Sequence, residues 1–501
     1  MNFFKKIKFP TAHTVLFLIS AVICVLTWVV PAGQFDRLFY DGEKQIFIRS
    51  SYTTQMELPA TQKTLITLGI EIPLEKFTSG ALSKPISIPN TYQKLDNRPQ
   101  GLVAFIQAPL KGIIQSADII LLVLIIGGLV QIVNATRAFE AGIAWLGNQL
   151  RGKEYLLIVL VTILIALGGT TFGLEEETIA FYPILLPIFL AAQYDALVCV
   201  GAIYIGSCIG TLASTINPFS TIIASDAAGI NWTEGLDGRI LMLILGLLIC
   251  IAYIIRYAQR VKQDPEQSII YAQKGEIEKR FLNVNLANGI ALNGKLKLVL
   301  VLFSGCFIVM VYGVSQLGWW FLEMTSVFLA GALLIGVIAR INEKLFVNEF
   351  INGAKDLLSV AFIIGIARGV TVLMNDGQIS DTLLFYTSEL TSGMQKGLFI
   401  NISYLLYSGL TFFIPSSSGM AVLTMPIMAP LADTAGIDRS VMVSAYQYGW
   451  GLFKFINPTG IILASLAIVN VGFDKWLKFI WPLVIGIGLL GIIILTVSVY
   501  V

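Results

Sequence analysis

The sequence contains a single histidine, His13, and only 13% of its 501 residues are charged. One histidine excludes zinc sites built on paired histidines, and it excludes Ser-His or Cys-His catalytic pairs away from that position. Soluble domains carry roughly 25% charged residues, so this chain has too few polar side chains to cover a water-soluble globule. The arithmetic also excludes secreted disulfide scaffolds, disordered chains and nucleic-acid-binding proteins.

Cysteine is scarce as well, since the chain has five, scattered through apolar stretches without CxxC spacing. They are interpreted as small buried hydrophobic residues, and no metal site or cofactor is expected. Abundant instead are hydrophobic residues, at 56% of the chain, with a mean hydropathy of +0.79. This composition is typical of a polytopic membrane protein.

The first long apolar stretch belongs to segment 1–31, which is predicted to be a transmembrane helix. A signal peptide is the alternative, but the stretch is long and lacks a small-x-small cleavage site. Segment 32–100 is polar and rich in Pro, Thr and Ser, so we predict an extracytoplasmic segment without a catalytic domain of its own.

Two apolar segments are interrupted by short polar tips. Segment 154–193 is divided by the acidic tip 173–178, and segment 398–432 by the serine-rich tip 415–419. A full span needs about 20 apolar residues, and the second arm of each segment is shorter than that. Both segments are therefore predicted to be re-entrant hairpins.

Two further segments, 196–228 and 440–470, are too long for one straight span and contain Asn-Pro in the middle. Proline removes a backbone donor and unwinds a helix. Unwound backbone is tolerated at membrane depth only where it packs in protein or lines a watery cavity. Two broken helices beside a ligand site are therefore predicted.

Lysine and arginine are concentrated in the segments predicted to be cytoplasmic, as the positive-inside rule requires. The basic loop 260–297 holds seven lysine and arginine residues, and Arg256 lies just before it. The same rule predicts a cytoplasmic N-terminus. Other members of the inner set are Lys5, Lys6, Lys8, Arg137, Arg151, Lys153, Arg340 and Lys344.

The unusual features occur twice, in the same order, at a shift of about 243 positions. Segments 101–259 and 298–500 each hold a span, a hairpin and a broken helix, and their first spans run in opposite directions. The predicted fold is an all-α membrane protein of about nine transmembrane helices, two re-entrant hairpins and two broken helices. Inverted repeats of this kind are typical of secondary transporters with a midplane site.

The stretches Gly168–Thr178, Phe181–Pro187 and Leu212–Phe219, with Val30–Arg37 and Ile414–Gly419, resemble the YfcC family. This family is related to the DcuC carriers of the ion transporter superfamily. The resemblance implies a multi-pass carrier of the bacterial inner membrane that works by an elevator motion. It also implies basic amino acid exchange of the arginine/ornithine type, with C4-dicarboxylate transport as the alternative.

The candidate substrate-binding residues lie at the tips and breaks. Consecutive carboxylates at membrane depth need a cation, a proton or hydrogen bonds, so the acidic tip is predicted to bind a positive group. The serine tip suits a carboxylate, and Lys454 is predicted to receive a carboxylate, replace a coupling cation or form a structural ion pair. The full set is Glu175, Glu176, Glu177, Ser214, Thr215, Asn217, Ser416, Ser417, Ser418, Lys454, Asn457 and Thr459.

Other features receive structural or negative interpretations. Arg368 lies outside the tips and breaks and is expected to form a structural pair. Gly206/Gly210 and Gly365/Gly369 are expected to mark close helix packing. The stretch 147–154 almost matches a phosphate-binding loop but ends in glutamate, so ATP binding is not expected.

The sequence predicts a carrier and not an enzyme, with a small charged molecule and the lipid bilayer as its partners. Na⁺ or H⁺ is the candidate coupling ion, and a homodimer is expected by analogy with related architectures. An ion channel is the distant alternative, and an intramembrane Ser-Lys enzyme is a weaker one still.

Overall fold

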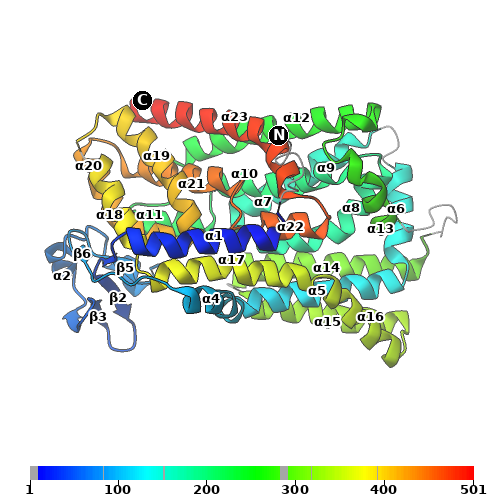
Figure 1. Cartoon of the computed structure of the whole chain (residues 1–501), viewed down its shortest axis with the longest axis horizontal. Helices are drawn as coiled ribbons and strands as arrows, with labels where there is room; N and C mark the ends of the chain where they lie inside the picture. The colour runs from blue at the N-terminus through cyan, green and yellow to red at the C-terminus, as the bar shows by residue number, and fades with distance from the viewer. Residues whose placement is uncertain are drawn as a thin grey trace, which may run out of the picture.

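The computed structural model describes residues 10–82, 84–149, 153–282, 292–317, 319–391 and 393–500. Lys5, Lys6, Lys8, Arg151 and part of the basic loop 260–297 lie outside these ranges. The described chain is mostly helical, and its long helices run roughly along one common axis (Figure 1). The predicted class of helical membrane protein is confirmed.

Eight described helices are long and apolar enough to cross a membrane. Apolar side chains such as Val337 and Ile485 are exposed on them, which is expected for contact with lipid and unfavourable in water. The eight are α1 (Ala12–Val29), α5 (Ala117–Ala135), α7 (Tyr155–Phe172), α12 (Leu236–Gln263), α14 (Gly294–Leu317), α15 (Phe321–Ala339), α17 (Leu358–Asp376) and α23 (Phe473–Tyr500).

Close glycine contacts join α4 (Leu102–Gln115) to α17 and α5 to α16 (Glu343–Asp356). A Cβ on Gly112 would lie 2.1 Å from the carbonyl oxygen of Gly365, and one on Gly353 would lie 2.2 Å from that of Gly127. Backbone cannot move aside as a flexible side chain can, so glycine is required for these approaches. The packing expected at Gly365 is confirmed.

The segment between α1 and α4 is a folded β domain, which the sequence did not predict. Its four-stranded antiparallel sheet has the order β4-β3-β2-β5, and β1 pairs with β6. Strands of two to five residues are too short for a clear alternating pattern, although Leu38 and Phe47 are fully buried in the domain core. The elements are β1 (Gly33–Gln34), β2 (Arg37–Asp41), β3 (Ile46–Ser50), β4 (Gln55–Pro59), α2 (Gln62–Thr67), α3 (Glu75–Thr78), β5 (Ile86–Ser87) and β6 (Gln93–Lys94).

Both predicted tips are helix ends. Helix α7 ends at Gly173, whose φ of 75° is left-handed and costs glycine little. The chain then forms a 3₁₀ turn, η2 (Glu176–Phe181), and helix α8 (Tyr182–Ala191). In the second copy α19 (Lys396–Phe413) ends because Ile414 precedes proline and leaves the helical conformation, and α20 (Ser417–Thr434) begins after it.

Both predicted breaks interrupt helices. The first rod consists of α9 (Ala196–Val200), η3 (Gly201–Ile205) and α10 (Gly206–Leu212), and it resumes after the break as η4 (Pro218–Ile222) and α11 (Ile223–Ala228). The second consists of α21 (Arg439–Lys454) and α22 (Ile462–Ile468). Each rod packs on the first arm of its own hairpin, α10 on α7 and α21 on α19.

The remaining helices connect these units at the ends of the molecule. They are α6 (Ala138–Gln149), η5 (Pro265–Gln267), η6 (Tyr271–Gln273), α13 (Lys274–Phe281) and α18 (Ser380–Thr391). The β domain lies at one end of the molecule and α13 near the other (Figure 1).

Candidate functional site

A cavity of about 410 Å³ lies where the two tips meet helices α5, α15 and α17. Acidic residues of the first tip and hydroxyl residues of the second tip line it together. The predicted site residues in its lining are Glu175, Glu176, Glu177, Asn217, Ser416, Ser417, Ser418 and Thr459. Ser214, Thr215, Lys454 and Asn457 are not among the residues that line it.

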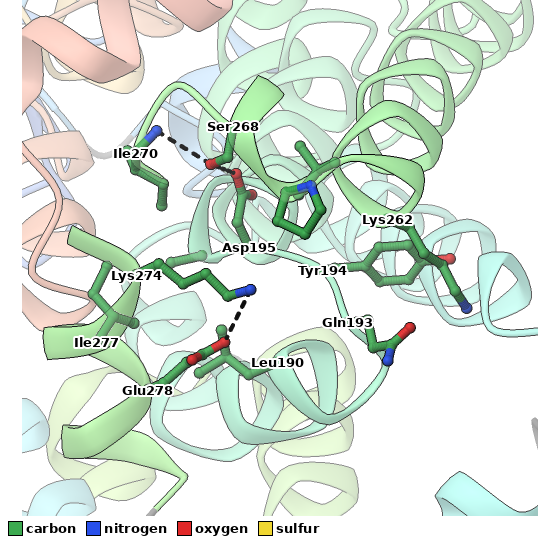
Figure 2. A pocket seen from close by; sticks show the side chains of 13 residues that line it. Leu190, Gln193, Tyr194, Asp195, Lys262, Ser268, Ile270, Lys274, Ile277 and Glu278 are labelled. Atoms are coloured by element: carbon green, nitrogen blue, oxygen red, sulfur yellow. Dashed lines mark hydrogen bonds and ion pairs between the residues drawn. The ribbon is translucent and has the colours of Figure 1, made fainter. Parts of the chain in front are cut away.

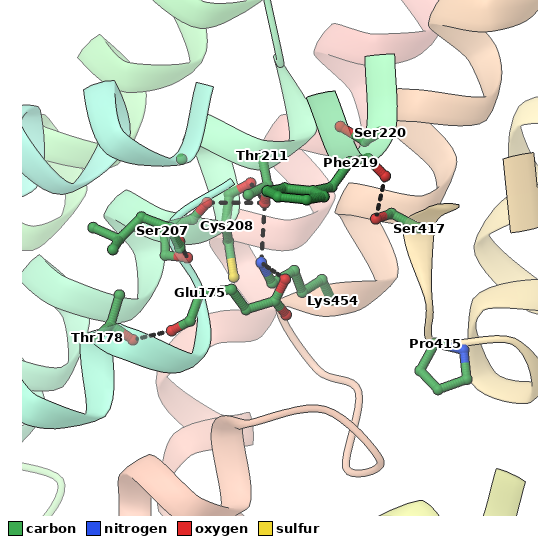
Figure 3. Close-up of polar contacts among 12 residues, drawn as sticks. Glu175, Thr178, Ser207, Cys208, Thr211, Phe219, Ser220, Pro415, Ser417 and Lys454 are labelled. Atoms are coloured by element: carbon green, nitrogen blue, oxygen red, sulfur yellow. Dashed lines mark hydrogen bonds and ion pairs between the residues drawn. The ribbon is translucent and has the colours of Figure 1, made fainter. Parts of the chain in front are cut away.

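Glu175 and Lys454 form an ion pair in the wall of the cavity (Figure 3). The carboxylate Oε2 lies 2.9 Å from Nζ, and the two side chains are only 20% and 4% exposed. Nζ also donates to the Thr211 hydroxyl at 3.1 Å and lies 5.3 Å from the ring centre of Trp450. Of the three roles expected for Lys454, the ion pair is the one that this geometry shows.

Glu176 and Glu177 differ from Glu175, because among the described residues no cation forms an ion pair with them. Both are half-buried and line the cavity. Glu177 accepts a hydrogen bond from the backbone N–H of Glu175 at 3.1 Å, which fixes the turn. The tip therefore offers up to two carboxylates to a positively charged guest.

The serine tip is held by its neighbours. Ser416 caps α20 by accepting from the Gly419 N–H at 3.2 Å, and Ser417 donates to the Phe219 carbonyl at 3.0 Å. Tyr446 and Trp450 donate to the carbonyls of Ser417 and Pro415, at 2.8 and 3.0 Å. The N-terminus of α20 therefore has a fixed position beside the cavity, where its dipole favours an anion.

The two break asparagines make equivalent contacts. Asn217 Oδ1 accepts from the N–H of Phe219 at 2.8 Å, and Asn457 Oδ1 accepts from that of Thr459 at 3.0 Å. Their Nδ2 groups donate to Gly169 and Thr411, at 3.5 and 3.3 Å, on the first arm of each hairpin. Asn217 thus caps η4, Asn457 holds the turn before α22, and each amide ties its break to the first arm of its own hairpin.

The hydroxyls of the breaks bond within the protein. Ser214 Oγ accepts from Thr221 at 2.6 Å, and the backbone N–H of Thr215 donates to Thr170 at 3.0 Å. Thr459 donates to Asn457 at 2.7 Å, although it also lines the cavity. In this conformation they stabilise the unwound segments.

Sequence reasoning missed Gln447, which is fully buried between the two rods. Its Nε2 donates to the Thr211 carbonyl at 2.5 Å, and its Oε1 accepts from Thr221 at 3.3 Å. Gln447 lies in the uninterrupted part of α21, away from the tip and the break, where no sequence pattern predicts a contact between the rods.

Two cations line the cavity although the sequence did not place them in the site. Arg368, expected to be a structural pair, lines the cavity, and none of the described acidic residues forms an ion pair with it. Lys84 of the β domain lines it too and donates to Ser418 at 2.6 Å. A segment so far away in the sequence could not be assigned to the site from its own pattern.

A second cavity of about 270 Å³ lies between α8, α12 and α13 (Figure 2). Its buried carboxylate, Asp195, accepts from Ser268 at 2.6 Å and Tyr257 at 2.7 Å, and burial raises the pKa of Asp195. Lys274 and Glu278 face each other 3.8 Å apart. The polar groups of this cavity form hydrogen bonds and an ion pair with one another, so we interpret it as a structural contact between helices.

Comparison with known proteins decides the family. The family model described as "DcuC: C4-dicarboxylate anaerobic carrier" matches residues 9–500. The chain belongs to the DcuC family. It is therefore a multi-pass membrane transporter and not an enzyme, as the sequence predicted.

Two relatives of this DcuC-family chain align over almost all of it. An uncharacterized protein of Haemophilus influenzae is 42% identical over 497 residues, with 99% of this chain and 98% of the relative covered. The Escherichia coli protein named "Putative basic amino acid antiporter YfcC" is 30% identical, with 98% and 95% covered. The resemblance drawn from the tip and break motifs is confirmed.

Two solved transporters also align with the DcuC-family chain, with low scores. The Alcanivorax borkumensis YdaH transporter has a TM-score of 0.39 at 11% identity and covers 97% of this chain and 98% of its own. Neisseria gonorrhoeae MtrF has a TM-score of 0.40 at 15% identity and covers 98% and 96%.

Proposed function

We propose that the protein is a secondary active carrier that exchanges basic amino acids of the arginine/ornithine type. The observation that carries this proposal is the charge arrangement of the 410 Å³ cavity. Glu176 and Glu177 are available for a cationic side chain on one wall. Arg368 and the N-terminus of α20 are available for a carboxylate on another.

The Glu175–Lys454 pair supports this assignment because it occupies one of the three tip carboxylates, so that only Glu176 and Glu177 remain for a substrate. A buried pair of this kind compensates itself, and it leaves the charge of the other two glutamates, when they are ionised, without an ion-pair partner among the described residues. A substrate with a guanidinium or ammonium group would compensate that charge, whereas a simple dicarboxylate would be repelled by it. The substrate carboxylate is accordingly assigned to the serine tip and Arg368, in place of Lys454.

Transport is proposed to occur by an elevator-like alternating-access motion. The hairpins and broken rods would move together against a frame that includes the α4–α17 and α5–α16 pairs. Two inverted copies give two conformations of similar energy, which is what alternating access requires. We place the carrier in the bacterial inner membrane with its N-terminus in the cytoplasm, and a homodimer through the frame is the proposed assembly.

A C4-dicarboxylate carrier coupled to Na⁺ or H⁺ is the second candidate. It is favoured by the family description and by Arg368, which has no ion-pair partner among the described residues. Protonation of Glu176 and Glu177 would then have to accompany binding of the dianion. An ion channel is the least favoured alternative, because the observed feature is a cavity between the tips and not a pore along the molecule.

Counterflow in liposomes tests the proposal. Purified protein is reconstituted into vesicles loaded with unlabelled arginine, ornithine or succinate, and entry of labelled arginine or succinate is followed. Exchange of arginine for ornithine that saturates with concentration supports the proposal. Movement of succinate without transport or competition by either basic amino acid would overturn it, and flux that never saturates would indicate a channel.

A further inference from the structure

Lys84 is a residue of the β domain, yet its side chain lines the cavity between the tips. Its Nζ donates to the Ser418 hydroxyl at 2.6 Å, near the N-terminus of α20. Arg368 of α17 lines the same cavity. Two cations therefore lie beside a helix N-terminus, although none of the acidic residues that the structure describes forms an ion pair with either.

The two cations repel each other, and the carboxylates that line the same cavity, Asp118 and the acidic tip, form no ion pair with either. Burial and the positive charge of Arg368 lower the pKa of the Lys84 ammonium. The hydroxyl of Ser418 is neutral and cannot offset two charges, and the dipole of α20 adds further positive potential. A carboxylate between these groups would gain charge-assisted hydrogen bonds and relieve the repulsion.

The position of Lys84 is set by docking of the whole β domain. Lys76 pairs with Asp226 of α11 at 2.6 Å, and Arg37 pairs with Asp381 of α18 at 2.7 Å. The Tyr92 hydroxyl lies 2.9 Å from that of Thr382. Because Asp226 and Asp381 are buried, these pairs are specific contacts between the domain and the membrane helices.

We infer that Lys84, Arg368 and Ser418 bind the substrate carboxylate, so that the extracytoplasmic β domain supplies a specificity-determining residue. The inference rests on the proposed carrier function and deepens it. It means that the carboxylate site is complete only while the domain is docked.

The test compares a ligand that has a carboxylate with one that lacks it. Inhibition of labelled arginine exchange by arginine and by agmatine, its decarboxylated analogue, is measured in liposomes for wild type, Lys84→Met and Lys84→Arg. Lys44→Met is the matched control, because Lys44 lies in the same domain in an exposed pair with Glu57. Thermal stability of each purified variant shows that it is folded.

The K84M variant is expected to lose about tenfold in apparent affinity for arginine, with little change for agmatine. K84R should recover most of that loss, and the control should match wild type. Equal losses for both ligands, or none for either, would overturn the assignment of Lys84.

The proposed substrate class can be wrong even if Lys84 binds a carboxylate, and the following result distinguishes the two. If wild type exchanges succinate and not arginine, the basic amino acid proposal falls, and K84M is tested with succinate and its monoamide. A larger loss for the dianion than for the monoamide would still support Lys84 as a carboxylate ligand. Equal effects on the two would exclude it.

Discussion

At the scale of single residues, the buried pair of Glu175 and Lys454 determines which carboxylates of the acidic tip remain for a substrate. Breaking a buried pair leaves an uncompensated charge, which is more damaging than removing both partners. The same ion pair therefore contributes to the fold and sets the charge available to a substrate.

Replacing Lys454 by Met is expected to reduce exchange by more than about tenfold, because it leaves Glu175 buried without its cation. The double variant with Glu175→Gln should recover part of the lost activity and stability. Initial exchange rates in liposomes measure this, with exposed Lys396→Met as control. Equal effects at positions 454 and 396 would remove Lys454 from the site.

Replacing Glu176 or Glu177 by Gln is expected to weaken arginine binding by about tenfold, because a neutral amide attracts a cation less. Competition by ornithine should weaken in parallel. Glu389→Gln is the control, because Glu389 is exposed on α18 and does not line the cavity. Unchanged arginine affinity in both variants would contradict a cation site at the acidic tip.

The sequence could predict the glutamates, the serines and Lys454, because polar residues in apolar runs are conspicuous. It could not predict which glutamate Lys454 would neutralise, since that depends on packing between copies. It also could not place Lys84 or Gln447. Lys84 lies in a segment far from the tips, and Gln447 lies in an unbroken helix, so their contacts depend on tertiary packing that no local pattern shows.

At the scale of elements, the breaks and tips were predictable because proline and glycine interrupt helices for local reasons. Asn-Pro at 217–218 and 457–458 lies at the observed breaks, and Gly173 ends α7. The β domain was not predictable, because its strands are short and its core depends on contacts between distant strands. Helices α4 and α16, which extend the frame, were also missed, because each is short and only partly apolar.

Replacing Asn217 or Asn457 by Ala is expected to destabilise the protein by about 1–2 kcal/mol, because each loses a hydrogen bond that orders the break and a tie to its hairpin. The two variants should behave alike, as the equivalent contacts indicate. Thermal unfolding in detergent measures the change, with exposed Asn134→Ala as control. A loss of substrate binding at wild-type stability would instead indicate direct ligand contact.

At the scale of the whole molecule, the β domain joins units that are expected to move relative to each other. It pairs with α11, which continues a broken rod, and with α18, which connects the frame helix α17 to the second hairpin. Motion of the rods should therefore alter the docking of the domain.

Replacing Lys76 by Met is expected to lower arginine affinity several-fold, because the domain loses its pair with Asp226 and holds Lys84 less firmly. Agmatine inhibition should change little. The competition assay measures both, with Lys44→Met as control. A loss of maximal rate at unchanged affinity would point to a role in motion alone.

Each break asparagine binds the first arm of its own hairpin. A hairpin that opened alone would break that amide contact, so each hairpin and its rod should travel together through the turnover cycle. The spacing between residues 169 and 217 should then stay constant in every state, while that between residues 84 and 418 changes. A pair of spin labels at each location would report the cycle as one fixed and one variable separation.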